Sequence, residues 1–118
     1  MEDLIKSVQN LASQEYDRAA VKFGLMNHSD HESYSVIKEE LEEAGDEYTA
    51  LHSSLKDFWE LVKSKDADDA DKHAALVSLE TGAILAACEC IQVAAMAYKA
   101  QKTIRARMSC DTNIRKQV

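Results

Sequence analysis

The sequence contains no proline and only three glycines among its 118 residues. These residue types are the strongest local signals for turns and breaks, so long helices can run without interruption. Aromatic residues make up only 6% of the chain, and β-branched residues form no alternating runs. A β-sheet therefore has little support. Alanine, leucine, glutamate, lysine and aspartate are common instead, and we predict an all-α protein.

Basic residues are also few: 14 lysines and arginines stand against 21 acidic residues, giving a net charge of -7. A general basic surface is missing, so we expect no nucleic-acid polymer as a partner. Six of these 14 basic residues lie between residues 99 and 116. There they either complement the C-terminus of a helix or meet phosphates locally.

No signal-peptide layout opens the chain, because Glu2 and Asp3 come first and no long apolar core follows. We also find no continuous run of the roughly 18 to 20 apolar residues that a membrane span needs. The sequence therefore predicts a soluble, cytoplasmic protein with no membrane partner. Cys88 and Cys90 lie two apart on a predicted helix and point away from each other. We expect them to be small buried residues in a reducing compartment.

Apolar residues at helical spacing predict three helices, over residues 1–23, 31–65 and 69–108. Gly24 marks the end of the first helix, and Ser29 or Asp30 caps the second. The acidic segment 64–71 forms the next turn. We predict one domain over residues 1–108, followed by a polar tail over 109–118. The last two helices should form a long antiparallel hairpin, with the first helix beside it.

The hairpin turn should centre near residue 67 or 68. Reflection about that point places Glu43 opposite Gln92, and it places Asp46 and Glu47 near Glu89. The acidic residues of one helix thus fall beside two polar residues of the other.

Five carboxylates follow one another along the second helix within an arc of about 120°. They are Glu39, Glu40, Glu43, Asp46 and Glu47. Such a cluster is either a solvated acidic face or a site for a divalent cation, and oxygen ligands favour Mg²⁺, Mn²⁺ or Ca²⁺. Glu40 should lie at the boundary of the core, because the acidic arc overlaps the apolar one there.

Glu89 interrupts the apolar run from Ile84 to Tyr98. A carboxylate in such surroundings is costly unless it is protonated, hydrogen-bonded, paired or bound to a metal. The segment opposite is acidic, so a proton or a metal must lie between the partners. Gln92 follows one turn later, and its amide either ligates through oxygen or holds a carboxylate through its NH₂ group.

The third helix is apolar on nearly every side and rich in alanine. Three helices cannot cover such a helix completely, so we expect oligomerisation to complete the bundle. The prediction is a homodimer or homotetramer built around Ile84 to Tyr98.

Two stretches, HESYSVIKEELEEA (31–44) and ECIQVAAMAYKA (89–100), together resemble the MazG-like proteins of phages and prophages. These belong to the all-α nucleoside triphosphate pyrophosphohydrolase superfamily, whose pattern is EExxE followed by ExxD. Glu39, Glu40 and Glu43 match EExxE, and Glu89 matches the first position of ExxD. Gln92 stands where the pattern has aspartate.

The resemblance implies an Mg²⁺-dependent hydrolase, with Mn²⁺ as an alternative ion, that converts a nucleoside triphosphate to the monophosphate and pyrophosphate. The implied metal ligands are Glu39, Glu40, Glu43, Glu89 and Gln92. We assign Glu40 or Glu43 to orient or deprotonate the attacking water. His31, Lys38, Lys99 and Lys102 are candidates for substrate binding. Two alternatives remain: a catalytically weak metal- or nucleotide-binding protein, and a phage structural or interaction protein of the same fold.

Overall fold

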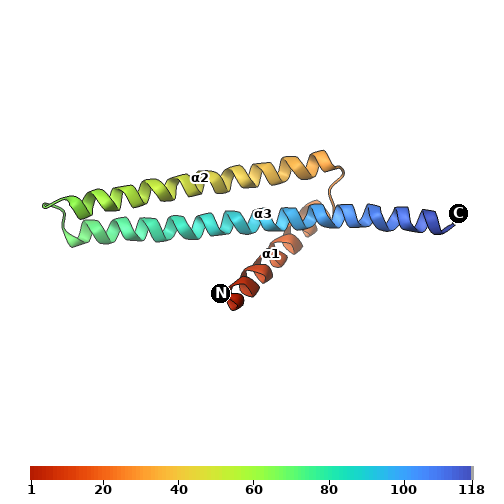
Figure 1. The fold of residues 1–118 in the computed structure, drawn as a ribbon, viewed down its shortest axis with the longest axis horizontal. Helices are drawn as coiled ribbons and strands as arrows, with labels where there is room; N and C mark the ends of the chain where they lie inside the picture. The colour runs from red at the N-terminus through yellow and green to blue at the C-terminus, as the bar shows by residue number, and fades with distance from the viewer. Residues whose placement is uncertain (118) are drawn as a thin grey trace. The chain divides into compact units, whose positions relative to one another are not determined.

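The structure is a computed structural model that describes the backbone of residues 1–117 and the side chains of residues 1–110. Within that range it consists of three helices, α1 (Glu2–Phe23), α2 (Asp30–Lys63) and α3 (Asp69–Gln117) (Figure 1). The all-α prediction is confirmed. The third helix is longer than predicted, because α3 continues through most of the segment expected to be a polar tail. Val118 lies outside the described residues.

Local chemistry explains where the helices begin and end. Gly24 follows α1 with a φ of 96°, which favours glycine, and its N–H donates to the carbonyl of Ala20 at 2.9 Å. At the start of α2, the Glu32 N–H donates to the hydroxyl of Ser29 at 3.1 Å. Asp68 caps α3 by accepting the N–H of Asp71 at 2.8 Å. The predicted cap at Ser29 is therefore confirmed.

The chain divides into two compact parts. The three-helix part comprises Met1–Glu40 and Ile91–Val118, and the hairpin part comprises Leu41–Cys90. The boundaries fall inside α2 and α3, which run on through both parts.

The three-helix part has a small core that joins α1 to the other helices. Tyr16, Ala95 and Met96 are buried there. The Tyr16 hydroxyl donates to the carbonyl of Leu25 at 2.8 Å, and its ring meets that of Tyr98 edge to face at 4.9 Å. These contacts attach α1 through its second half, while its first ten residues are exposed.

The connector between α1 and α2 is fixed by hydrogen bonds of Asn27. Its N–H donates to the hydroxyl of Thr103 at 3.0 Å, and its amide NH₂ donates to the hydroxyl of Ser33 at 2.8 Å. All three side chains are buried, so each polar group has the partner that burial demands.

In the hairpin part, α2 and α3 pack antiparallel and approach closely at Gly82. A Cβ atom on Gly82 would lie 3.1 Å from Cδ2 of Leu51. This contact and the approach of Glu43 to Glu89 show how α2 and α3 are aligned. Their register differs by two to three residues from the predicted one. The prediction that Glu43 faces Gln92 is wrong, because the loop between Lys63 and Asp69 centres on residue 66.

One further expectation needs correction. Cys88 and Cys90 are exposed rather than buried, and Cys110 is exposed as well. The hairpin covers only the side of α3 that faces α2, so residues on its other sides remain bare. By length and composition alone, α3 is long and apolar enough to cross a membrane, within Asp69–Cys110.

Candidate metal centre and pocket

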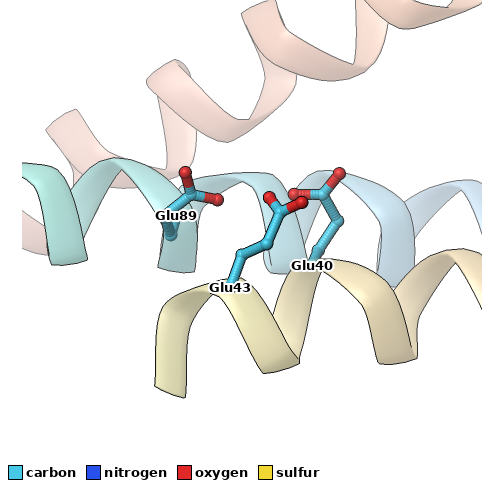
Figure 2. A group of neighbouring side chains, drawn as sticks. All are labelled: Glu40, Glu43 and Glu89. Carbon is cyan, nitrogen blue, oxygen red and sulfur yellow. The ribbon is translucent and has the colours of Figure 1, made fainter. Parts of the chain in front are cut away.

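Three carboxylates converge where α2 and α3 lie side by side (Figure 2). One oxygen from each of Glu40, Glu43 and Glu89 lies within 4.8 Å of the others. Glu40 precedes Glu43 by one turn of α2, so the helix itself places these two together. Glu89 comes from α3, and Glu43 and Glu89 both belong to the hairpin part.

The environment of Glu89 disfavours its charge. Partial burial raises the pKa of this carboxyl group, and the nearby charge of Glu43 raises it further. A hydrogen bond with Glu43 and the charge of Glu47 act in the same direction. Protonation of Glu89, or binding of a cation, would relieve this unfavourable interaction.

The donor set suits a hard divalent cation. Carboxylate oxygens are the ligands that Mg²⁺ and Mn²⁺ prefer, and Mg²⁺ usually takes only one or two carboxylates from the protein. Glu40 and Glu89 are half-buried and Glu43 is exposed, so the centre is open on one side. An open side leaves positions for water and for substrate oxygens.

The remaining acidic candidates take other places. Glu39 is exposed and does not belong to the group of three carboxylates, although it was predicted as a ligand. Asp46 is exposed, whereas Glu47 is half-buried and close enough to affect the pKa of Glu89. The prediction that Glu40 lies at the core boundary is confirmed.

A pocket of about 410 Å³ lies within the three-helix part. All three helices and the connector contribute to it. Its polar lining residues are Asn27, Glu32, Glu39, Glu40, Gln92 and Lys99, and its apolar ones are Ala19, Phe23, Val36 and Met96. The pocket thus combines an apolar wall, several carboxylates and one ammonium group.

Lys99 is the buried cation of this pocket. Its side chain is only 5% exposed, although lysine is among the residues that are rarely buried without a partner. Within the described part of the chain, its ammonium makes no ion pair. The side chain is thus covered by the helices while its ammonium lines the pocket, where it is suited to an anionic group of a ligand.

Gln92 takes one of the two roles open to it. Its amide NH₂ group donates to the carboxylate of Glu15 on α1, and this hydrogen bond lowers the pKa of Glu15 together with the stronger effect of Arg18. Gln92 also lines the pocket with Glu39 and Glu40. Its amide oxygen remains the atom through which the predicted metal ligation would occur.

The other predicted substrate residues lie outside the lining of this pocket. His31 and Lys38 are exposed on α2. Lys102 is half-buried and places its ammonium 5.1 Å above the ring of Tyr16 and 5.8 Å from that of Tyr98. Cation–π contacts of this kind stabilise the attachment of α1.

Sequence reasoning missed Glu15, Phe23 and Asn27. They belong to α1 and the connector, whose position beside α3 no sequence period reveals. The only available signal was the polar Asn27 between two apolar segments, since a buried asparagine often fixes a connection.

Comparisons of the chain with protein-family models, with curated proteins and with solved structures find no match. The functional argument therefore rests on the residues and geometry of the chain itself.

Proposed function

We propose that the protein is an Mg²⁺-dependent nucleoside triphosphate pyrophosphohydrolase of the cytoplasm. The observation that carries the proposal is the convergence of Glu40, Glu43 and Glu89 from two helices, with a raised pKa at Glu89. The raised pKa of Glu89 distinguishes this group from isolated acidic side chains on a helix surface. A divalent cation supplies it with the ligand chemistry that the three carboxylates offer.

The residues then divide the work of the reaction. A cation held by the carboxylates would neutralise charge on the phosphates, which is the main requirement of phosphoryl transfer. Glu40 or Glu43 would orient a water molecule or accept its proton. The water oxygen bonds to the phosphorus of the α-phosphate, the bond to the β-phosphate oxygen breaks, and the monophosphate and pyrophosphate leave.

The pocket supports binding of the rest of the nucleotide. Lys99 offers a positive charge from a buried position, and Phe23 and Met96 offer an apolar wall. Glu40 is common to the lining of this pocket and to the carboxylate group. An anionic group of a ligand would form a charge-assisted hydrogen bond with the Lys99 ammonium.

The proposal is tested by measuring pyrophosphate release from a panel of nucleoside triphosphates with Mg²⁺ or Mn²⁺. We expect release with at least one nucleotide, loss of activity in Glu43→Gln, and retention in Glu42→Gln. Glu42 is an exposed carboxylate next to Glu43. Its replacement by glutamine keeps the helix and changes the net charge by the same amount as Glu43→Gln. Equal activity in both variants, or no release with any nucleotide, contradicts the proposal.

A second candidate function is binding of metal and nucleotide with poor turnover. The bond between Gln92 and Glu15 favours it, because the amide at this position is used to hold α1. A protein with one fewer carboxylate at the centre binds the cation less tightly and stabilises less transition-state charge. Nucleotide binding without pyrophosphate release would distinguish this function from the first.

A further inference from the structure

The pocket of the three-helix part has two chemically different ends. At one end it is lined by Gln92 and by Glu40, a member of the carboxylate group. At the other end lies the connector between α1 and α2, where Asn27 lines the pocket and donates its backbone N–H to Thr103. Gln92 and Thr103 are eleven residues apart on α3, which corresponds to about 16 Å of helix. A ligand that fills the pocket therefore meets different groups at its two ends.

Lys99 lies between these two ends. It follows Gln92 by seven residues on α3 and precedes Thr103 by four. Side chains of a helix lean toward the N-terminus of that helix, which is here the direction of Gln92. In the proposed reaction Lys99 therefore serves the phosphates, and the groups beside the connector are left for the nucleoside.

Glu32 makes the connector end an acceptor of hydrogen bonds. Its side chain is half-buried and lines the pocket. Among the described residues it forms no ion pair, and it accepts only a long hydrogen bond of 3.4 Å from the backbone N–H of His28. An ionised carboxylate has two acceptor oxygens and no donor. Most of this acceptor capacity is thus open to a ligand.

Asn27 adds a second acceptor at the same end. Its side chain is fixed because its amide NH₂ group donates to the hydroxyl of Ser33 at 2.8 Å. No hydrogen bond within the described part of the chain reaches its carbonyl oxygen. Every buried side-chain polar atom of that part has a partner, so this oxygen is accessible rather than sealed in the protein. Because Asn27 lines the pocket, a ligand there can donate to it.

Phe23 gives the connector end a flat apolar surface. It is the last residue of α1, lines the pocket and is 69% exposed. Aromatic rings stack on every nucleobase, because each base has a π-face. Phe23 would hold a base without selecting it, so selection falls to Glu32 and Asn27.

We propose that the connector end binds the nucleobase and selects bases that carry an exocyclic amine, through the Glu32 carboxylate and the Asn27 carbonyl oxygen. This inference rests on the proposed function, because it assigns the nucleoside of the same ligand. Adenine and cytosine present an amine N–H to these acceptors. Hypoxanthine and uracil carry a carbonyl oxygen at that position, which repels a carboxylate and leaves it without a partner. A site built to hydrogen-bond one group strongly rejects the analogue that lacks it.

Matched pairs of nucleotides test the proposal by binding alone. Isothermal titration with Mg²⁺ compares the α,β-methylene analogues of ATP with ITP and of CTP with UTP, whose bond between the α- and β-phosphates resists hydrolysis. We expect the amino member of each pair to bind about tenfold more tightly or better, the equivalent of one hydrogen bond to a charged group. In Glu32→Gln the two members should bind within about threefold of each other, because an amide also donates to a carbonyl.

Asp17→Asn is the matched control. Asp17 is an exposed carboxylate of α1 outside the lining of the pocket, and its replacement changes the net charge by the same amount. This variant should keep the preference of the wild type. Circular dichroism verifies that both variants keep their helices.

The outcomes separate this proposal from the reaction proposed above. Equal binding of both members by the wild type, tighter binding of the ITP and UTP analogues, or an unchanged preference in Glu32→Gln overturns the base assignment and leaves the reaction intact. Selective binding without pyrophosphate release from the natural nucleotides supports the base assignment and contradicts the reaction. Absence of binding by all four analogues overturns both proposals.

Discussion

Glu43 of α2 and Glu89 of α3 face each other across the hairpin, and Glu43 makes the ionisation of Glu89 less favourable. Glu43 raises the pKa of Glu89 both by its charge and by their hydrogen bond. The chain gives this pair no cation of its own from the segment opposite Glu89, which is acidic. The stability of the pair should therefore depend on whether a proton or a metal ion neutralises it.

The stability of the metal-free protein should decrease as the pH rises past the ordinary glutamate pKa of 4.5 and through the raised pKa of Glu89. The folded state holds this proton more tightly than the unfolded state, so its contribution is complete at low pH and is lost as the proton leaves. Thermal unfolding in a chelator, at fixed protein concentration, measures the effect. The difference between wild type and Glu89→Gln should change in that pH window, and a constant difference contradicts the account.

Saturating Mg²⁺ should remove this pH dependence, because a bound cation stabilises the ionised pair. We expect the midpoint of thermal unfolding of the wild type to rise with Mg²⁺ near neutral pH. The Glu89→Gln variant should show little rise. An equal rise in both proteins would mean that the ion binds elsewhere.

Replacing Gln92 by aspartate should weaken the attachment of α1. The Gln92→Asp variant loses the amide that donates to Glu15 and sets two carboxylates against each other. We expect the free energy of unfolding to fall by about 1–2 kcal/mol in urea titrations. The double variant Glu15→Gln with Gln92→Asp should recover most of the loss, because the new amide donates to the new carboxylate. If catalysis is limited by Gln92, pyrophosphate release should be higher in this double variant than in the wild type.

Lys99→Met should weaken nucleotide binding while the fold is retained. If the Lys99 ammonium contacts a phosphate as proposed, its removal should reduce affinity by about ten- to hundred-fold, the equivalent of one hydrogen bond to a charged group. Titration of a non-hydrolysable nucleoside triphosphate analogue measures it. Lys65→Met, in the exposed loop between α2 and α3, is the matched control. Equal affinities in both variants would exclude Lys99 from the ligand site.

Gly82 should tolerate no large side chain, because α2 approaches too closely. In Gly82→Leu the new side chain meets Leu51, whose Cδ2 would already lie 3.1 Å from a Cβ at this position. Overpacking of this kind lowers the free energy of unfolding by about 1–3 kcal/mol. Thr81→Leu, one residue earlier on the exposed side of α3, should change it little. A stable Gly82→Leu protein would contradict the close approach of the two helices.

Most of the secondary structure could be predicted from the sequence, because apolar spacing and end signals agree. Gly24 and Ser29 mark their helix ends as expected, and the scarcity of glycine and proline leaves room for few others. The register of the hairpin was missed by two to three residues. It depends on how many residues the turn takes, and the acidic segment before Asp69 offers several similar caps.

The candidate site was predictable where it depends on one helix and hidden where it depends on packing. Glu40 and Glu43 share a face by spacing alone, and Glu89 is conspicuous in an apolar run. The burial of Lys99 and the bond from Gln92 to Glu15 both require α1 to lie against α3. Cys90 was predicted to be buried but is exposed, because the sequence shows that a residue is apolar and not whether another segment covers it.

The most direct test of the central claim is isothermal titration of Mg²⁺ and Mn²⁺ into chelator-treated protein, comparing wild type, Glu89→Gln and the control Glu42→Gln. The account predicts one binding site per chain in the wild type and the control, and its loss in Glu89→Gln. That result would identify Glu89 as a ligand held in an apolar helix for its metal. Absence of binding in the wild type, or equal binding in all three proteins, would contradict the claim and leave the Glu43–Glu89 pair as a proton-sharing contact of the hairpin.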